Sequence, residues 1–408
     1  MPLWLEEIAH TALLPLRNRN FRLFFLGQSL SLIGSWVHTT AQRWLMFELT
    51  HSASMLGILG AVGSLPVLLF SLPAGCLADR LPKKRLLILS QMVAAFQAFI
   101  LALLVYFHQV KAWHVLALAF VLGSTVALEF PVRHSFIYDL VGKEPLVAAL
   151  SLHSTAFNLA RFIGPALAGL LMTTLGLAWC FFFNAFSYLP VILALNFIVI
   201  SDQRALAAAK NPLEGIREGF VYAWQHRTIR TTLLLIAVTS IFILPYAVLL
   251  PVLAKESFGA GAKGFSFLMA ANGLGALLGA MFMASIGPRL RKDRNILFNL
   301  SGLSLYLGLL ALSKSLEIAA LFLLAAGFHM VCTFTSANAH LQLNTPDEIR
   351  GRILSLFSLS FLGLFPLGSF LSGLLAQHLG TVKVFLLGSI IGVTATLFAF
   401  WRGFGRRF

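Results

Sequence analysis

Four charged residues lie inside long apolar stretches of this 408-residue chain: Arg43, Glu129, Arg133 and Arg161. Charge inside a bilayer is costly, so such residues pair with one another or serve a transport pathway. Arg133 follows Glu129 by one helical turn, and Arg161 lies near the middle of the next apolar stretch. We therefore expect Glu129 to pair with one of these two arginines.

Glu129 has two interpretations that the sequence leaves open. Burial favours the protonated form of a carboxylic acid, and a nearby cation favours the charged form. A carboxylate poised between these two influences can carry a proton during transport. A permanent ion pair that staples two helices is the equal alternative.

Polar side chains recur at helical spacing in three apolar stretches. The first set is Gln28, Ser31, Ser35, His38, Thr39 and Gln42; the second is Ser151, Ser154, Asn158 and Arg161; the third is His329, Thr333, Ser336 and His340. Steps of three and four residues keep each set on one helix face. Hydrocarbon does not tolerate such a face, so each must look into a cavity or onto another helix. The histidines could relay protons, but hydrogen bonding within a wall is the simpler role for each.

Enzymatic chemistry has no residues to support it. The three cysteines, Cys76, Cys180 and Cys332, are far apart and have no metal-binding spacing, so they read as small apolar side chains. No nucleophile stands with a base, and no G-x-x-x-x-G-K-[ST] phosphate loop occurs. We expect no enzyme, no metal and no cofactor, and any energy for transport must come from an ion gradient.

The composition indicates a membrane protein with many spans. Hydrophobic residues make up 58% of the chain and charged residues only 11%, with a mean hydropathy of +0.86; soluble domains carry roughly 25% charge. The net charge of +15 does not indicate nucleic-acid binding, because the basic residues punctuate apolar runs and do not gather on one soluble face.

Twelve stretches are long enough to cross a bilayer, which takes about 20 apolar residues. They cover about 21–47, 54–78, 86–108, 112–138, 147–175, 177–200, 229–254, 264–287, 295–313, 316–343, 352–377 and 380–402. The first, fifth, tenth and eleventh are polar enough that the count could be one lower.

The distribution of positive charge predicts the orientation. With both termini in the cytoplasm, most of the 30 Lys and Arg residues fall in cytoplasmic segments, whereas the outer loops hold only Lys111, Lys255, Lys263, Lys314 and Lys383. Lys and Arg favour the cytoplasmic side of a membrane. We expect a multi-pass protein of the cell inner membrane, surrounded by lipid and monomeric.

The chain divides into two halves that resemble each other. Ala149-Leu150-Ser151-Leu152 recurs as Ile353-Leu354-Ser355-Leu356, and Gly169-Leu170-Leu171 recurs as Gly373-Leu374-Leu375, both at an offset of 204 residues that Gly176 and Gly380 share. The expected domains are a six-helix bundle over 1–200, a cytoplasmic linker with an amphipathic helix over 201–228, and a second six-helix bundle over 229–408. Parallel repeats of this kind build one large class of transporters.

A motif after the second stretch carries a family resemblance. Gly75-Cys76-Leu77-Ala78-Asp79-Arg80-Leu81-Pro82-Lys83-Lys84-Arg85 resembles the signature between helices 2 and 3 of the major facilitator superfamily. The resemblance implies a gating motif of Gly75, Asp79 and Arg80, in which Asp79 docks near the start of helix 11, beside Arg350 and Arg352. A loop that only fixes orientation is the alternative. The second half, Gly287-Pro288-Arg289-Leu290-Arg291, lacks the aspartate.

A second motif points to export. Asn158-Leu159-Ala160-Arg161-Phe162-Ile163-Gly164-Pro165-Ala166-Leu167-Ala168-Gly169 looks like the Gly-Pro motif of exporters in that superfamily. Pro165 removes a backbone donor and bends the helix, while Gly164 and Gly169 permit close packing. A packing kink without a role in export is the alternative.

Three longer stretches resemble one branch of that superfamily. They run from Leu26 to Thr50, from Phe130 to Val141 and from Ile349 to Leu356, and they are similar to the enterobactin-exporter-like branch, also called transmembrane secretion effectors. The resemblance implies an all-α membrane fold of twelve helices in two six-helix bundles related by a pseudo-twofold axis. Helices 1, 4, 7 and 10 line the cavity in that superfamily, so the first and third polar sets fall where a substrate path should be. Arg43 departs from the branch pattern.

The expected function is secondary active export. A siderophore or related metabolite leaves the cell by alternating access, and protons are the expected exchange ion. The alternatives are a multidrug efflux pump and a lipid or lysophospholipid flippase on the same fold. With 37 Phe and few acids, the cavity should suit aromatic or amphipathic cargo.

Overall fold

The protein is a bundle of long helices. The computed structural model describes residues 13–199 and 212–405, with the backbone alone for 71–80 and 212–216. Within these residues all regular structure is helical, and eleven helical stretches are long and apolar enough to cross a membrane. The remaining long helix, α2 (Arg19–Thr50), packs against α6, α7 and α8 and completes the twelve spans expected from the sequence.

The helices follow the predicted stretches closely. The first half contains α2, α3 (Ala53–Arg80), α4 (Lys83–Tyr106), α5 (Ala112–Val141), α6 (Leu146–Thr174), and a sixth span made of α7 (Leu177–Ser187) and α8 (Leu189–Phe197). The second half contains α10 (Arg227–Val238), η2 (Thr239–Ile243), α11 (Tyr246–Phe258), α12 (Ala262–Ser285), α13 (Lys292–Leu312), α14 (Leu316–Leu343), α15 (Asp347–Ser358), η4 (Leu359–Gly363), α16 (Phe365–Leu379) and α17 (Thr381–Trp401). The short helices η1 (Leu14–Arg17), α9 (Pro212–Gln225) and η3 (Gly287–Arg289) lie between spans.

Two of the spans in the second half are broken by π-helices that the sequence did not predict. η2 interrupts the seventh span ahead of Pro245, and η4 interrupts the eleventh span ahead of Pro366. The two π-helices meet, since the Ser240 hydroxyl donates to the carbonyl of Phe361 at 2.6 Å. π-helical turns widen a helix locally and are frequent at functional sites.

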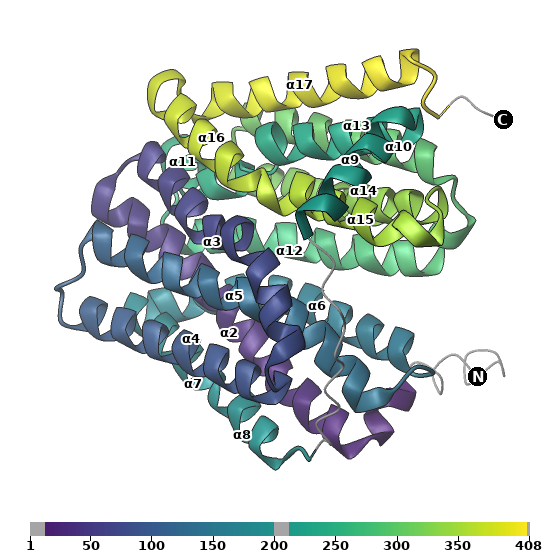
Figure 1. Ribbon diagram of the computed structural model, residues 1–408. Coiled ribbons are helices and arrows are strands. Elements are labelled where there is room, and N and C mark those ends of the chain that lie inside the picture. The colour runs from purple at the N-terminus through teal and green to yellow at the C-terminus, as the bar shows by residue number, and fades with distance from the viewer. Residues whose placement is uncertain (1–12, 200–211, 406–408) are drawn as a thin grey trace, which may run out of the picture.

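The helices form two bodies that lie one above the other in Figure 1, with α2–α8 below and α10–α17 above. Both ends of the chain lie at the same end of the molecule, which we name the termini side; the far side is the opposite end, where α2 joins α3. The bodies touch mainly through two helix pairs, α6 with α12 and α3 with α16. These pairs join helix 5 of one half to helix 2 of the other, as a pseudo-twofold axis requires.

The internal repeat is visible in the backbone. Gly176 and Gly380, 204 residues apart, each join the fifth to the sixth span of their half with a positive φ, +98° and +88°. Gly164 and Gly368 keep the same offset, and each lies against the first helix of its own half, α2 and η2. Glycine is favoured at positions 176 and 380 because any other residue would be strained at a positive φ.

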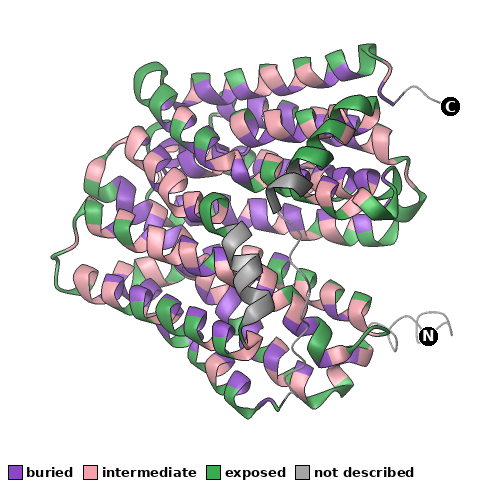
Figure 2. Ribbon diagram, in the orientation of Figure 1, coloured by how far each residue is buried: buried purple, intermediate pink, exposed green. Residues whose placement is uncertain are grey.

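The outer surface is apolar, as lipid contact requires. Large hydrophobic side chains such as Phe96, Phe197, Phe298 and Trp401 are more than half exposed. Figure 2 shows exposed residues along the outer helices, including α17. Such exposure would be unfavourable in water, so it supports a multi-pass membrane protein.

The segment between the halves contains the short helix α9 where it is described. α9 packs on α15 and α10, and it leaves Phe220, Val221 and Trp224 exposed. An exposed apolar face on a short helix at the termini side suits the membrane interface. The rest of the predicted linker up to residue 211 lies outside the described residues.

Candidate functional site

The two bodies are closed against each other on the far side. A Cβ atom added at Gly373 on α16 would come within 2.6 Å of the Cα atom of Gly57 on α3, and one at Gly169 on α6 within 2.7 Å of the Ser266 side chain on α12. Near the rim, the Ser52 hydroxyl donates to Oε1 of Gln377 at 3.0 Å. Small residues thus let the two bodies touch backbone to backbone along this half.

The termini side is open by comparison. Ser151, Ser154 and Thr155 on the first turns of α6 are exposed, whereas Asn158 and Ala160 further along the helix are buried. On the other body, α12, η3, α14, α15 and η4 surround an open cavity of about 640 Å³. This cavity opens toward the end that holds the termini.

Arg161 bridges the two bodies at mid-depth. Its Nη2 atom donates to Oδ1 of Asn272 on α12 at 3.0 Å, and its guanidinium lies over the ring of Trp36 on α2, 5.6 Å from the ring centre. The amide of Asn272 is oriented by two further bonds, to the Tyr246 hydroxyl at 2.7 Å and to the carbonyl of Leu323 at 3.2 Å. Arg161 is therefore not the partner of Glu129.

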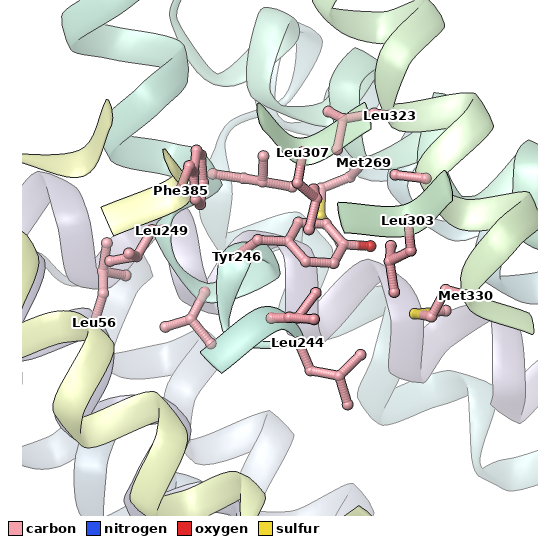
Figure 3. Close-up of a cluster of buried hydrophobic side chains, with 14 of the residues drawn as sticks. Leu56, Leu244, Tyr246, Leu249, Met269, Leu303, Leu307, Leu323, Met330 and Phe385 are labelled. Carbon is pink, nitrogen blue, oxygen red and sulfur yellow. The ribbon is translucent and has the colours of Figure 1, made fainter. Parts of the chain in front are cut away.

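Arg43 makes a second bridge beside the first. Its Nη1 atom donates to the carbonyl of Ala247 at 3.3 Å and lies 4.0 Å from the Met269 sulfur. Ala247 is next to Tyr246, and Met269 is one helical turn from Asn272, so the two guanidiniums reach adjacent parts of the second body. Figure 3 shows Tyr246 surrounded by apolar side chains that include Met269 and Met330.

Glu129 pairs with the arginine of its own helix. Arg133 Nη1 lies 2.8 Å from Glu129 Oε1, and Gln28 on α2 donates to the same oxygen at 3.3 Å. The side chains of Glu129 and Arg133 are 12% and 14% exposed. The group is thus enclosed but still reachable by water, which a proton-binding carboxylate needs.

Most of the polar set on α2 contacts other helices of the first body. Gln28 reaches α5; Ser31 donates to Gln91 on α4 at 3.5 Å; and Ser35 lies 3.3 Å from the Tyr188 hydroxyl. His38 is fully buried edge-on to Phe181, and neither ring nitrogen has a partner among the described residues. Gln42 is also buried, so in this polar set only Ser35 and Thr39 keep intermediate exposure.

In this structure two members of the polar set on α14 contact α13. His329 Nδ1 lies 2.8 Å from Oδ1 of Asn299 on α13, and Ser336 accepts from Asn295 on the same helix at 2.6 Å. Thr333 and His340 are buried, with His340 edge-on to Phe404. Two asparagines on α13 supply the polar partners, so these residues join two helices within one body.

A different face of α14 lines the cavity. It carries Phe334, Thr335, Asn338 and Gln342, opposite Phe357 and Phe361 of the eleventh span. The steps of three and four between Thr335, Asn338 and Gln342 are a signal in the sequence for this face, but it carries no ionisable side chain, unlike the face with the two histidines. The aromatic lining agrees with the expectation of aromatic contacts for cargo.

The predicted latch is only partly described. The side chains of Gly75, Asp79 and Arg80 lie outside the described residues. Arg350 pairs with Asp347 of its own helix, and Arg352 pairs with Glu218 on α9. Both arginines expected opposite Asp79 thus have another partner in the described part of the chain.

The Gly-Pro motif positions α6 between three helices. Gly164 lies against Trp36 on α2, and Gly169 lies against Ser266 on α12. Asn158, one turn before Arg161, is buried and donates to the carbonyl of Ser154 at 2.9 Å. Pro165 removes the helical bond to the carbonyl of Arg161, and Gly273 on α12 lies directly against that oxygen. The motif therefore shapes the contact between the bodies at the level of Arg161.

Comparison with known proteins agrees with this geometry. A family model described as "Transmembrane secretion effector" matches residues 10–403. A staphyloferrin A transporter of Staphylococcus aureus (strain NCTC 8325 / PS 47) is 29% identical over 385 residues, which cover 91% of this chain and 93% of that protein. The multidrug efflux pump Tap of Mycolicibacterium fortuitum is 25% identical over 377 residues, or 89% of this chain and 91% of that protein.

Solved structures share the fold. An inward-facing, unoccupied bacterial homologue of the human lysosomal transporter Spinster has a TM-score of 0.73 at 16% identity, with 96% of this chain and 98% of that chain covered. A D-xylose–proton symporter has a TM-score of 0.72 at 14% identity, with 92% and 96% covered.

Proposed function

Because the chain belongs to the transmembrane secretion effector family of the major facilitator superfamily, we propose that it exports a small organic molecule by alternating access in exchange for protons. It is a membrane transporter of small molecules and not an enzyme. Its two bodies, residues 1–200 and 229–408 with a linker between them, rock about the central contact and open one side at a time.

One observation carries this proposal: the bodies touch backbone to backbone on the far side, while a cavity of about 640 Å³ opens at the termini side. An open route on one side only is what an alternating-access carrier requires of each state. The termini side is the cytoplasmic one, because it holds most of the Lys and Arg residues. The protein acts as a monomer in the cell inner membrane and loads cargo from the cytoplasm.

Glu129 is the proposed proton carrier. Arg133 and Gln28 both contact Oε1 of its carboxylate. Protonation breaks the pair and releases α5 from its bond to α2, so the proton can alter the packing of two helices that line the pathway. His38 has no hydrogen-bond partner among the described residues to receive or pass on a proton, so we assign it no relay role.

The relatives support two proposals for the substrate class. A siderophore or related metabolite is the first candidate, because the staphyloferrin A transporter is similar over nearly its whole length. Multidrug efflux is the second, supported by the similarity to the pump Tap and to macrolide efflux protein A of Streptococcus pyogenes. A lipid flippase would need a lateral opening between helices.

Transport into inverted vesicles tests the proposal. We expect uptake of staphyloferrin A, with a macrolide as the competing cargo, to rise when the vesicle interior is acidified relative to the outside. Glu129→Gln should abolish this response to the pH gradient and slow uptake by about tenfold or more. Glu256→Gln, at an exposed carboxylate on α11, is the matched control and should behave as the wild type. Uptake by Glu129→Gln with an unaltered pH response would exclude Glu129 as the coupling residue.

A further inference from the structure

We propose that Arg43 and Arg161 form a binding site for the acidic groups of the cargo, so that the transported molecule is an organic anion with carboxylate or other oxyanion groups. This inference rests on the transport function proposed above and names the class of substrate. The two guanidiniums give the centre of the molecule an excess of positive charge.

Neither arginine has an acidic partner among the described residues. The protein acceptors of Arg161 are Oδ1 of Asn272 and the sulfur of Met330, and those of Arg43 are the carbonyl of Ala247 and the sulfur of Met269. A guanidinium has five N–H donors in a fixed plane. Most donors of both side chains are therefore left without a protein acceptor in the described part of the chain.

The two guanidiniums contact neighbouring residues of the second body, because Arg43 reaches Met269 and Arg161 reaches Asn272, one helical turn further along α12. They come from different helices, α2 and α6, and both reach the region of Tyr246 and Asn272 in the second body. Charge that is buried without a counter-charge is strongly unfavourable, and a second like charge adds to the cost. An anion placed between the two would relieve both effects.

The surroundings restrict where such an anion can lie. Apolar side chains close the far side of the site, where Trp44 stacks on Phe265 with ring centres 5.9 Å apart. Arg43 and Arg161 both keep intermediate exposure, whereas Trp44 and Phe265 are buried. Ligand therefore reaches the pair from the termini side, and the ring of Trp36 under Arg161 offers a flat surface beside it.

Guanidinium geometry favours oxyanions over other anions. Planar pairs of N–H donors match the two oxygens of a carboxylate or a phosphate group. The neutral donor amide of Asn272 and the hydroxyl of Tyr246 hold the second body at this point without supplying charge. Binding of an anion that competes for Arg161 would weaken its bond to Asn272, which couples loading to the contact between the bodies.

Binding to the detergent-solubilised protein tests the site directly. The probes are citrate, as a polycarboxylate, its neutral trimethyl ester, and vesicles of phosphatidylglycerol as a lipid source of phosphate. We expect citrate to raise the melting temperature and to quench tryptophan fluorescence, with the ester without effect. Arg43→Gln and Arg161→Gln should each weaken citrate binding by about tenfold or more, since a hydrogen bond between charged groups is lost. Arg161→Lys should keep part of the affinity.

Arg227→Gln, an exposed arginine at the start of α10, is the matched control and should bind citrate as the wild type does. A response to phosphatidylglycerol but not to citrate would assign the site to a lipid headgroup and overturn the proposal of a soluble organic anion. Equal citrate binding by the two arginine variants and the wild type would show that the arginines only hold the bodies together. Macrolide transport with no binding of citrate would leave the export function standing and remove this inference alone.

Discussion

Arg161 shows how one backbone position can fix the contact between two bodies. Its carbonyl has no helical donor because Pro165 lies four residues later, and the backbone of Gly273 fills the space beside that oxygen. The position of the guanidinium thus depends on a proline in its own helix and a glycine in the partner helix. The proline was recognised in the sequence, but its partner glycine lies 112 residues from Arg161 and has no local signal.

A methyl group at position 273 should therefore disrupt this contact. In Gly273→Ala the Cβ atom would overlap the Arg161 carbonyl, and backbone must move to relieve it. We expect a loss of about 1–3 kcal/mol in stability and slower transport, measured by thermal unfolding in detergent and by vesicle uptake. Gly261→Ala, where a Cβ atom meets nothing within 4 Å, should change neither. Equal melting temperatures for the two variants would contradict the overlap.

The partner of Glu129 could be narrowed to two arginines from the sequence alone. The spacing of four residues already made Arg133 one of two candidate partners, and the structure shows that pair. Arg161 was the other candidate because both residues lie in neighbouring apolar stretches. The direction in which a side chain points depends on how its helix packs against helices that are distant in the sequence. Arg161 points toward Asn272, which lies 111 residues away, and the sequence gives no local signal for this contact.

At the level of helices, the two faces of α14 carry polar residues with different surroundings. One face bonds to Asn295 and Asn299 on α13, and the other lines the cavity with Thr335 and Asn338. Polar residues at helical spacing predict only that a face meets a polar or wet surface. They do not say whether that surface is a cavity or another helix, and in this structure the face with His329 and Ser336 meets α13.

Substitutions at the two faces of this helix should differ in whether they change the stability of the protein or its KM for cargo. Asn299→Ala removes the partner of His329 and should cost about 1 kcal/mol of stability with an unchanged KM for the transported cargo. Asn338→Ala should leave the melting temperature within about 1 °C of wild type and change KM several-fold. Both are measured by thermal unfolding and initial uptake rates. A change of KM in Asn299→Ala alone would reverse our assignment of the faces.

The positions of the helices were more predictable than their interruptions. The need for about 20 apolar residues to cross a bilayer sets the bounds of each span within a few residues. The π-helices η2 and η4 were not predicted, because their sequences, Thr239–Ile243 and Leu359–Gly363, are as apolar as the helices around them. They arise where the seventh and eleventh spans contact each other.

The whole molecule is held in one state by its far-side contact, and that contact can be trapped. We replace Ser52 and Gln377, whose side chains are hydrogen-bonded, with cysteine in a chain whose three native cysteines are changed to alanine. A short bis-methanethiosulfonate reagent, which links two thiols through disulfides, should then abolish uptake because the far side cannot open. A reducing agent cleaves these disulfides and should restore uptake. The single Ser52→Cys variant is the control. Full activity after complete cross-linking would show that transport does not require this side to separate.

The pseudo-twofold arrangement explains why so much of the fold was evident in advance. The offset of 204 residues seen in short sequence matches also relates Gly164 to Gly368 and Gly176 to Gly380, which occupy equivalent joints and contacts. Charged residues do not follow the repeat: Arg43, Glu129 and Arg161 all belong to the first half. The scaffold is thus duplicated while the proposed chemistry is confined to one copy.

The ion pair between Glu218 on α9 and Arg352 on α15 has a mechanical consequence. It ties the surface helix to the eleventh span, and the exposed rings of Phe220 and Trp224 then travel with the upper body each time the carrier cycles. A dye attached to α9 would accordingly keep its distance from α15 and change its distance from α4. The helix α9 would thus move along the lipid headgroups together with the upper body. The charge and thickness of the membrane would then change the rate of the transport cycle.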